Sequence, residues 1–255
     1  MSKEFLPTIL KQKEQEVGAM SYEELQPLRS TYSLYEYLKS QSQELQLIAE
    51  VKKASPSLGD INLAVDIVEQ ARTYERCGAA MISVLTDEIF FKGHLDYLRE
   101  ISSRVTIPTL NKDFIIDEKQ IVRARNAGAT VILLIVAALS EKRLQELYDF
   151  ATGLGLEVLV ETHNLAELET AHRIGARIIG VNNRNLVTFE TDINTSLQLS
   201  AHFKDDRVYV SESAIFSKED AELVAPYFHA VLVGTALMQA EDVAEKIKEL
   251  KIDKG

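Results

Sequence analysis

The stretch EVLVETHNLAELETAHRIGARIIGVN (157–182) decides the fold, because it contains one complete strand–helix–strand unit. The apolar runs EVLVE (157–161) and RIIGVN (177–182) have the length of buried strands, whereas NLAELETAHRIGA (164–176) has helical periodicity and ends near Gly175. Two strands joined by a helix pair in parallel through a right-handed crossover. The stretch therefore predicts a parallel α/β sheet.

The same alternation extends outward from this unit in both directions. The further apolar runs are LIAEV (47–51), AMISVL (80–85), PTLNKD (108–113), TVILLIV (130–136), RVYVSE (207–212) and AVLVG (230–234). The further helical segments are 63–78, 117–129, 140–155 and 217–228, with Ser140 and Ser217 as N-caps and Gly78, Gly128 and Gly155 at the ends. Eight strand–helix units in roughly 200 residues fit a closed (β/α)8 TIM barrel better than an open sheet.

The first 46 residues contain no convincing strand. FLPTILKQKEQEV (5–17) has helical spacing, and Ser21 to Glu24 and Ser33 to Glu36 both fit a capping box. So short a segment cannot form its own core, so it must pack on the barrel, either simply or as a partial lid over the mouth. Because no flexible linker interrupts the chain, we interpret residues 1–255 as one domain, with a helical extension (1–46) and a barrel (47–255).

Composition limits the partners of the chain. A net charge of -11 over 255 residues argues against nucleic acid or an anionic membrane, although a local basic pocket can still bind an anionic small molecule. Cys77 is the only cysteine, which excludes an internal disulfide and a cysteine-based metal cluster. No long apolar stretch or signal peptide is recognisable, so we expect a cytoplasmic protein, and the absence of an apolar surface stripe favours a monomer.

Polar side chains stand near the carboxyl ends of the apolar runs. An unpaired ion in a buried strand costs several kcal/mol, against a domain stability of about 5–15 kcal/mol. A layer of salt bridges could explain one such pair, but four separate strands supply this set at one rim, where a parallel barrel has its active site. The residues are Glu50, Lys52, Lys112, Glu161, Asn182 and Arg184.

Strand parity predicts which of these side chains share a face, because residues two apart in a strand point the same way. The pairs are Glu50 with Lys52, Asn182 with Arg184, and Ser211 with Ser213. A carboxylate keeps a lysine charged, whereas burial or a second lysine favours release of its proton near neutral pH. The set suits proton transfer without a metal, and the five histidines show no HxH or HExxH spacing.

Two other features predict the ligand. SESAIF (211–216) and VGTALMQ (233–239) follow the last two strands, where small residues and a short helix after Gly234 favour a phosphate site over ordinary turns. FFKGHL (90–95) brings Phe90 and Phe91, which could equally be core residues, and Phe114 shares the face of Lys112. The ligand expected is aromatic with an anionic tail.

Several ordered motifs resemble the indole-3-glycerol-phosphate synthase family over essentially the whole chain. They are IAEVKKASPS (48–57), LNKDFIID (110–117), ILLIVAAL (132–139), VLVETHN (158–164), IGVNNRNL (179–186), SESA (211–214) and LVGTALM (232–238). The resemblance implies a carboxy-lyase of tryptophan biosynthesis. Such an enzyme closes the pyrrole ring of 1-(2-carboxyphenylamino)-1-deoxyribulose 5-phosphate and releases carbon dioxide and water, with no cofactor or metal.

The resemblance also implies roles for single residues. Lys112 is similar to the family's general acid, and Lys52 to the lysine that engages substrate anions. Glu161 would stabilise cationic intermediates with Glu50 as its partner, and which of Lys52, Glu50 and Glu161 acts in dehydration stays open. Asn182 would hydrogen-bond a substrate hydroxyl.

The remaining residues that the resemblance implies contact the substrate. Arg184 and Glu212 would bind its polar groups, Ser55 would stand at the entrance loop, and Phe91, Phe114 and Leu133 would line the aryl pocket. Lys52, Ser213, Ala214, Gly234 and Thr235 would bind the phosphate, with Ser213 also counted among the catalytic residues. Ala214 replaces the glycine usual in the family, which would cost about 1 kcal/mol if this position needs a positive φ.

Two alternatives fit parts of the pattern. A phosphoribosylanthranilate isomerase is also a phosphate-binding barrel, but it would want a Cys or Asp acid/base pair, and Cys77 is misplaced for that role. A non-catalytic barrel that binds phosphorylated metabolites would account for Ala214. It would not account for the charged residues at the mouth.

Overall fold

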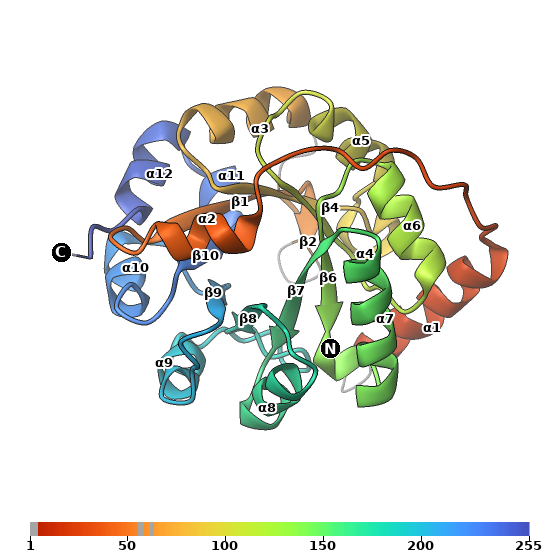
Figure 1. The fold of residues 1–255 in the computed structure, drawn as a ribbon. Helices are drawn as coiled ribbons and strands as arrows, with labels where there is room; N and C mark the ends of the chain where they lie inside the picture. Colours follow the sequence, from red (N-terminus) through yellow and green to blue (C-terminus); the bar gives the residue numbers. More distant parts are fainter. Residues whose placement is uncertain (1–4, 56–58, 62–63, 255) are drawn as a thin grey trace.

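The computed structural model describes residues 5–55, 59–61 and 64–254, and its centre is a closed barrel of eight parallel strands (Figure 1). The order around the barrel is β1-β10-β9-β8-β7-β6-β5-β4. The strands are β1 (Gln46–Val51), β4 (Met81–Leu85), β5 (Thr109–Lys112), β6 (Val131–Ile135), β7 (Glu157–Thr162), β8 (Ile178–Asn182), β9 (Val208–Glu212) and β10 (Ala230–Val233). Each agrees with its predicted run to within one residue at either end, so the predicted (β/α)8 barrel is confirmed.

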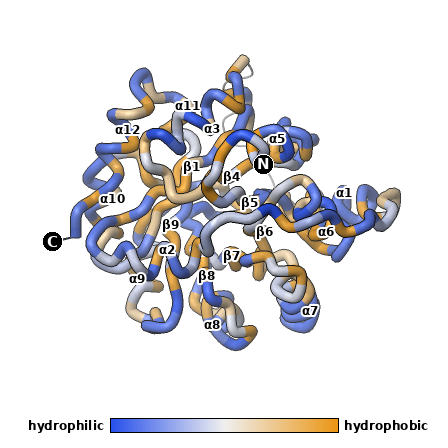
Figure 2. The backbone as a smooth tube through the Cα atoms, turned by 45° about the horizontal axis from the view of Figure 1, so that its top comes forward, coloured by the Kyte–Doolittle hydropathy of each residue, from blue (hydrophilic) through white to orange (hydrophobic). Residues whose placement is uncertain are grey.

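Helices surround the barrel and alternate between polar and apolar residues along their length (Figure 2). The helices after β1 are α3 (Ile67–Arg76), α4 (Glu88–Phe91), α5 (Leu95–Ser102), α6 (Glu118–Asn126), the short 3-10 helix η1 (Val136–Ala138), α7 (Glu141–Gly153), α8 (Leu165–Arg173), α9 (Asn194–Ser200), α10 (Lys218–Val224), α11 (Thr235–Met238) and α12 (Val243–Leu250). Ser140 and Ser217 cap α7 and α10 as predicted, and the glycines that follow α3, α6, α7 and α8 have positive φ.

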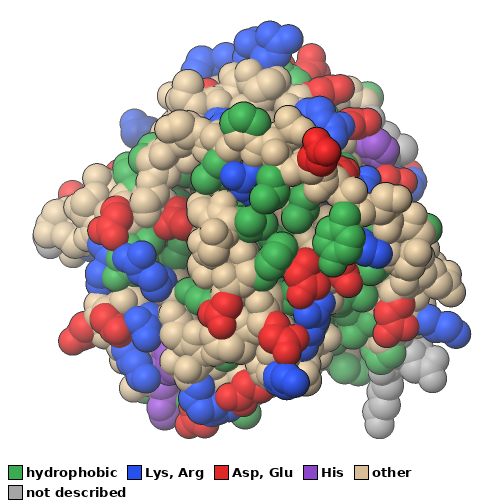
Figure 3. Space-filling view, turned by 45° about the vertical axis from the view of Figure 1, so that its right-hand side comes forward, with side chains coloured by type: hydrophobic (Ala, Val, Ile, Leu, Met, Phe, Trp, Pro, Cys, Tyr) green, Lys and Arg blue, Asp and Glu red, His purple; other side chains and the backbone are tan. Residues whose placement is uncertain are grey.

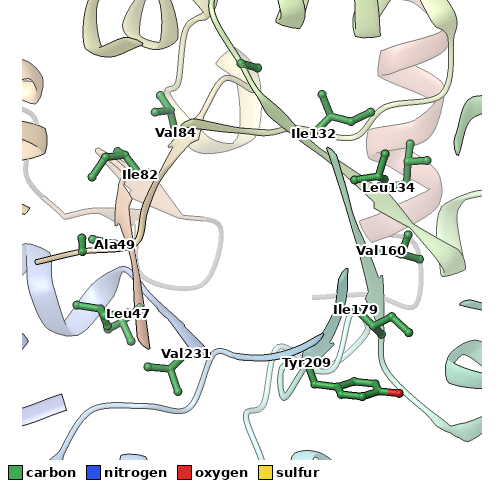
Figure 4. Packing of buried hydrophobic residues seen from close by; sticks show 14 of the residues in the cluster. Leu47, Ala49, Ile82, Val84, Ile132, Leu134, Val160, Ile179, Tyr209 and Val231 are labelled. Carbon is green, nitrogen blue, oxygen red and sulfur yellow. The ribbon is translucent and has the colours of Figure 1, made fainter. Parts of the chain in front are cut away.

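Strand parity separates two apolar layers. Side chains such as Val84, Ile132 and Leu134 point away from the barrel centre and pack against the helices (Figure 4). Their neighbours along each strand fill the interior in a second cluster that includes Ile48, Met81, Leu110, Leu133, Leu159, Ile178, Val210 and Leu232. The inward residues that follow this cluster toward the carboxyl ends of the strands are therefore the ones that reach the mouth.

The predicted N-terminal extension forms two helices, α1 (Phe5–Ala19) and α2 (Leu34–Ser40), joined by a long extended segment (Figure 1). Leu34 and Leu38 of α2 are fully buried in the interior cluster of the barrel. Ser33 is the N-cap of α2 and accepts a hydrogen bond from the backbone N–H of Glu36, but the return bond of the predicted capping box is not formed. Glu157 at the start of β7 accepts a hydrogen bond from the backbone N–H of Leu34 (2.6 Å). α2 therefore closes the amino-terminal end of the barrel, opposite the mouth.

The capping box expected at Ser21 to Glu24 is wrong, because residues 20–33 form no helix. Pro27 would remove a backbone donor from a helix that began there. The segment is instead held in an extended form by side chains of α6 and by its own arginine. The backbone N–H of Gln26 donates to Asn126 (2.9 Å), and Arg29 donates to the carbonyl oxygen of Ile107 (3.0 Å).

Candidate active site

One pocket at the carboxyl ends of the strands brings together nearly all the predicted site residues. Those that line it are Glu50, Lys52, Phe91, Lys112, Phe114, Leu133, Glu161, Asn182, Arg184, Glu212, Ser213, Ala214, Gly234 and Thr235. Ser55, expected at the entrance loop, ends β2 (Ala54–Ser55), whose backbone forms a small antiparallel hairpin with β3 (Gly59–Asp60). The pocket is where a barrel of this type binds its ligand.

Lys112 is the centre of the charged set. Its Nζ lies 2.7 Å from Oε2 of Glu161 and 3.1 Å from Oε2 of Glu212, so β5, β7 and β9 each supply one group. Both carboxylates are buried, at 2% and 1% exposure. The ammonium is thus held between two carboxylates that water barely reaches.

Burial and charge set the protonation states of this cluster. Burial opposes the charge on Lys112, but Glu161, Glu212 and Glu50 outweigh it and raise the pKa of the lysine. Burial likewise opposes ionisation of Glu161, but Lys112 and His163 hold the pKa of this carboxyl well below its usual range. The sequence analysis allowed two states for a lysine of this set, one kept charged by a carboxylate and one that releases its proton near neutral pH. The raised pKa of Lys112 favours the charged state in the free protein.

Glu212 behaves differently from Glu161 although both contact the same lysine. Burial raises the pKa of Glu212 to about 7, with Lys112 opposing the shift and Glu161 adding to it. Its Oε1 is buried without a hydrogen-bond partner among the described residues. This oxygen fits there only because residue 180 is glycine, since a Cβ at Gly180 would lie 2.0 Å from it.

Glu50 on β1 and Lys52 just beyond its end form a second ion pair. Nζ of Lys52 lies 3.0 Å from Oε1 of Glu50, and Ser83 Oγ donates to the other carboxylate oxygen at 3.4 Å. A Cβ at Gly234 would lie 2.5 Å from that Oε1 and 2.9 Å from Nζ. Glycine at this position therefore leaves room for the pair, and β10 ends beside it.

Asn182 and Arg184 both line the pocket, as strand parity predicted. The amide oxygen of Asn182 accepts a hydrogen bond from the backbone N–H of Arg184 at 3.0 Å. The Arg184 guanidinium donates to the carbonyl oxygen of Phe189 at 2.9 Å. These two hydrogen bonds hold the side chains of Asn182 and Arg184 in place at the start of the loop after β8.

An aromatic wall stands beside the charged set. The rings of Phe91 and Phe114 lie 6.2 Å apart, and Leu133 lines the pocket with them. Phe5 of α1 and Phe189 also line the pocket, with ring centroids 4.5 Å apart, and the sequence did not predict either. Helical periodicity located α1 but carried no information on which end of it reaches the mouth.

The pairing of Ser211 with Ser213 is wrong. Ser211 points out of the barrel and hydrogen-bonds Ser196 (2.8 Å) and the amide of Asn183 (3.0 Å), whereas Glu212 points inward. Ser213 lines the pocket because the strand has ended there and its φ is +64°, which breaks the alternation. Parity therefore fails where the backbone takes a positive φ, whereas Lys52 and Arg184 obey it although they lie just beyond their strands.

Ala214 has a φ of +60°, a conformation that glycine, the residue usual in the family at this position, adopts more easily than alanine. A left-handed conformation costs an L-residue about 1–2 kcal/mol, whereas alanine saves about 0.4–1 kcal/mol of chain entropy. We expect Ala214→Gly to raise the free energy of unfolding by about 0.5–1 kcal/mol, measured by urea denaturation. Ala166→Gly on the exposed face of α8 is the matched control and should lower it by a similar amount. A loss of stability in Ala214→Gly would contradict the prediction.

Glu212 also makes stability depend on pH. Its folded pKa of about 7 lies above the unfolded value, so its contribution is fully present below the unfolded pKa and is lost as pH rises through the folded one. We expect the melting temperature to fall between about pH 5 and 7, and Glu212→Gln to flatten this fall. Glu14→Gln, an exposed control on α1, should keep the slope of the parent chain. An equal slope in Glu212→Gln would contradict the prediction.

Within residues 5–55, 59–61 and 64–254, no three His, Cys, Asp or Glu side chains form a group that could hold a metal ion. Among the helices of these same ranges, none is both long and apolar enough to cross a membrane.

Known proteins resemble this chain over its whole length. Residues 6–250 match the family model for indole-3-glycerol phosphate synthase. The chain is 97% identical to the indole-3-glycerol phosphate synthase of Streptococcus gordonii over 255 residues, which is all of both chains. It is 74% identical to that of Streptococcus mutans, again over the full length of both.

Solved structures share the fold at much lower identity. A 3-hexulose-6-phosphate synthase from Salmonella typhimurium superposes with a TM-score of 0.65 and 15% identity, over 81% of this chain and 96% of that one. At this identity the likeness shows the barrel alone.

Proposed function

The chain belongs to the indole-3-glycerol phosphate synthase family, and we propose that the pocket described above is where it carries out that reaction. Enzymes of this family are carboxy-lyases of tryptophan biosynthesis. They convert 1-(2-carboxyphenylamino)-1-deoxyribulose 5-phosphate to indole-3-glycerol phosphate, carbon dioxide and water. The observation that carries the proposal is Lys112 between two buried carboxylates, beside an aromatic wall.

Lys112 acts as the general acid of ring closure. The aryl carbon attacks the ketone, and the developing alkoxide takes a proton from the ammonium, which Glu161 and Glu212 keep charged in the free protein. The attack leaves a positive charge on the aryl ring and its nitrogen. The Glu161 carboxylate, 2.7 Å from Lys112, stabilises that charge. Loss of carbon dioxide leaves its bonding electrons in the ring and neutralises that charge.

Dehydration needs a second acid and a base. The new hydroxyl leaves as water with one proton from an acid, while a base removes the proton that restores the aromatic pyrrole. Lys52 and Glu50, 3.0 Å apart, are an acid–base pair suited to these transfers. Asn182 hydrogen-bonds the departing hydroxyl or its neighbour, because its side chain lines the same pocket.

Binding groups surround this chemistry. Phe91, Phe114 and Leu133 pack on the aryl ring, and Arg184 binds its carboxylate. The phosphate lies at the other side, against Lys52 and the loops after β9 and β10. Those loops supply Ser213, Ala214, Gly234 and Thr235, the last at the start of α11.

The test is a steady-state assay that follows indole fluorescence, with the natural substrate and with the same compound lacking its phosphate. We expect product from the first and a kcat/KM about 10²–10⁴-fold lower with the second, because two or more charge-assisted hydrogen bonds of about 1.5–3 kcal/mol each are lost. Absence of product at high enzyme and substrate would overturn the proposed site. Equal kcat/KM for both compounds would overturn its phosphate end.

The proposal extends to partners and location. The protein acts on this phosphorylated aromatic compound as a cytoplasmic monomer, without nucleic acid. The net charge of -11 supports the absence of a nucleic-acid partner, as does the face in Figure 3, where acidic and basic side chains are interspersed rather than gathered into a basic patch.

A further inference from the structure

His163 stands two residues after Glu161, just beyond the end of β7. Its Nε2 lies 3.3 Å from Oε1 of Glu161, on the side of the carboxylate that faces away from Lys112. The side chain is only 10% exposed. Nε2 makes no hydrogen bond among the described residues, so its contact with Glu161 is an ion pair at 3.3 Å. Glu161 therefore lies between two cationic groups, the Lys112 ammonium at one oxygen and the His163 imidazole at the other.

Glu167 fixes the imidazole from its far side. Oε2 of Glu167 lies 3.0 Å from Nδ1 of His163 and accepts the backbone N–H of the same residue at 2.9 Å. The other oxygen of Glu167 accepts a hydrogen bond from the side chain of Asn164 at 2.7 Å. Because Asn164 is the N-cap of α8, this arrangement ties the imidazole to a regular element of the barrel.

The result is a row of alternating charges that runs from the rim into the pocket: Glu167, His163, Glu161 and Lys112. Burial opposes the imidazolium, but Glu161 and Glu167 outweigh it and raise the pKa of His163 to about 9. The ring is therefore charged at neutral pH. The other groups that face this row are Glu212 and Glu50, both of which raise the pKa of Lys112 with Glu161.

We propose that His163 is a positioning residue for the reaction, which holds the Glu161 carboxylate against Lys112 and keeps it ionised, with Glu167 holding His163 in turn. The proposal rests on the catalytic role proposed above for Glu161. The two ion pairs of His163, with Glu161 and with Glu167, support this role over simple packing. A neutral side chain of similar size would fill the same space, but only a cation pairs with carboxylates on both sides.

The first test does not depend on activity. The carboxyl carbons of glutamate are labelled with ¹³C in the full chain, and the Glu161 signal is assigned by its loss in Glu161→Gln. In His163→Gln we expect this signal to titrate about 1–3 pH units higher than in the parent chain, the shift caused by removing one adjacent cation. Titration at the same pH in both proteins would overturn the proposal, whether or not the chain turns over substrate.

The second test is the pH dependence of turnover. In His163→Gln, the fall in kcat/KM on the acid side should begin about 1–3 pH units higher than in the parent chain, because Glu161 is protonated at a higher pH once the adjacent cation is removed. Glu167→Gln should shift this fall in the same direction by less. His202→Gln, an exposed histidine, is the matched control and should leave it unchanged. An equal loss of kcat/KM at every pH, with a lower melting temperature, would show a structural role only and overturn the proposal.

Discussion

Lys112→Ala is expected to lower kcat by about 10²–10⁴-fold, the range lost when a positioned general acid is removed. Lys112 is the only lysine in contact with both Glu161 and Glu212 among the described residues, and it reaches the pocket from the end of β5. Substrate binding should change far less than turnover, because the aromatic and phosphate groups bind elsewhere in the pocket. The measurement is a steady-state kcat and KM by indole fluorescence, with the fold checked by circular dichroism.

Lys112→Arg is the variant that isolates proton donation from charge. A guanidinium keeps the ion pairs to Glu161 and Glu212 but is not deprotonated in proteins, so it cannot serve as the acid. We expect this variant to melt close to the parent chain and still lose most of its turnover. If either variant keeps more than about a tenth of the parent kcat, well above the loss expected for a general acid, the role of Lys112 is wrong.

The sequence predicted the barrel and most of the site because both depend on the same simple rule. Strand parity placed Glu50 with Lys52 and Asn182 with Arg184, and the structure brings all four into one pocket. The rule failed at Ser211, since parity within β9 selects Glu212 and the chain leaves the strand at Ser213. The site was therefore predictable up to the points where the backbone takes a positive φ, as it does at Ser213.

The same rule, applied once more, would have found His163, which stands two residues after Glu161 just as Lys52 follows Glu50. Phe5 could not have been found this way. It reaches the pocket through the tertiary position of α1, where its ring lies 5.8 Å from that of Phe90, and helical periodicity does not encode how a helix docks.

The N-terminal helix also supplies a buried cation that the sequence did not predict. Lys13 of α1 is 2% exposed, and its Nζ lies 2.8 Å from both Asp87 and Asp113. Asp87 caps α4 through the backbone N–H of Phe90, and Asp113 directly follows Lys112. One side chain of the extension thus ties together the two loops that carry the aromatic wall and the proposed acid.

Lys13→Met should therefore lower the free energy of unfolding by about 3–5 kcal/mol, the cost of leaving a buried charge without its partner. Asp87 is fully buried, so water cannot replace the lysine, and the loss would take a large part of the stability of an ordinary domain. The measurement is urea denaturation. Lys11→Met, exposed on the same helix, is the matched control and should stay within about 0.5 kcal/mol of the parent chain.

A double-mutant cycle separates the ion pair from packing. Asp87→Asn keeps a side-chain oxygen that can cap α4 but removes the charge, so Lys13→Met should cost much less in that background than in the parent chain. A coupling of at least about 1 kcal/mol is expected between the two positions. If Lys13→Met costs less than about 1 kcal/mol in the parent chain, as an exposed pair would, the extension is not held to the mouth by this lysine. Docking of α1 would then rest on its apolar contacts, Ile9 in the core and Phe5 at the pocket.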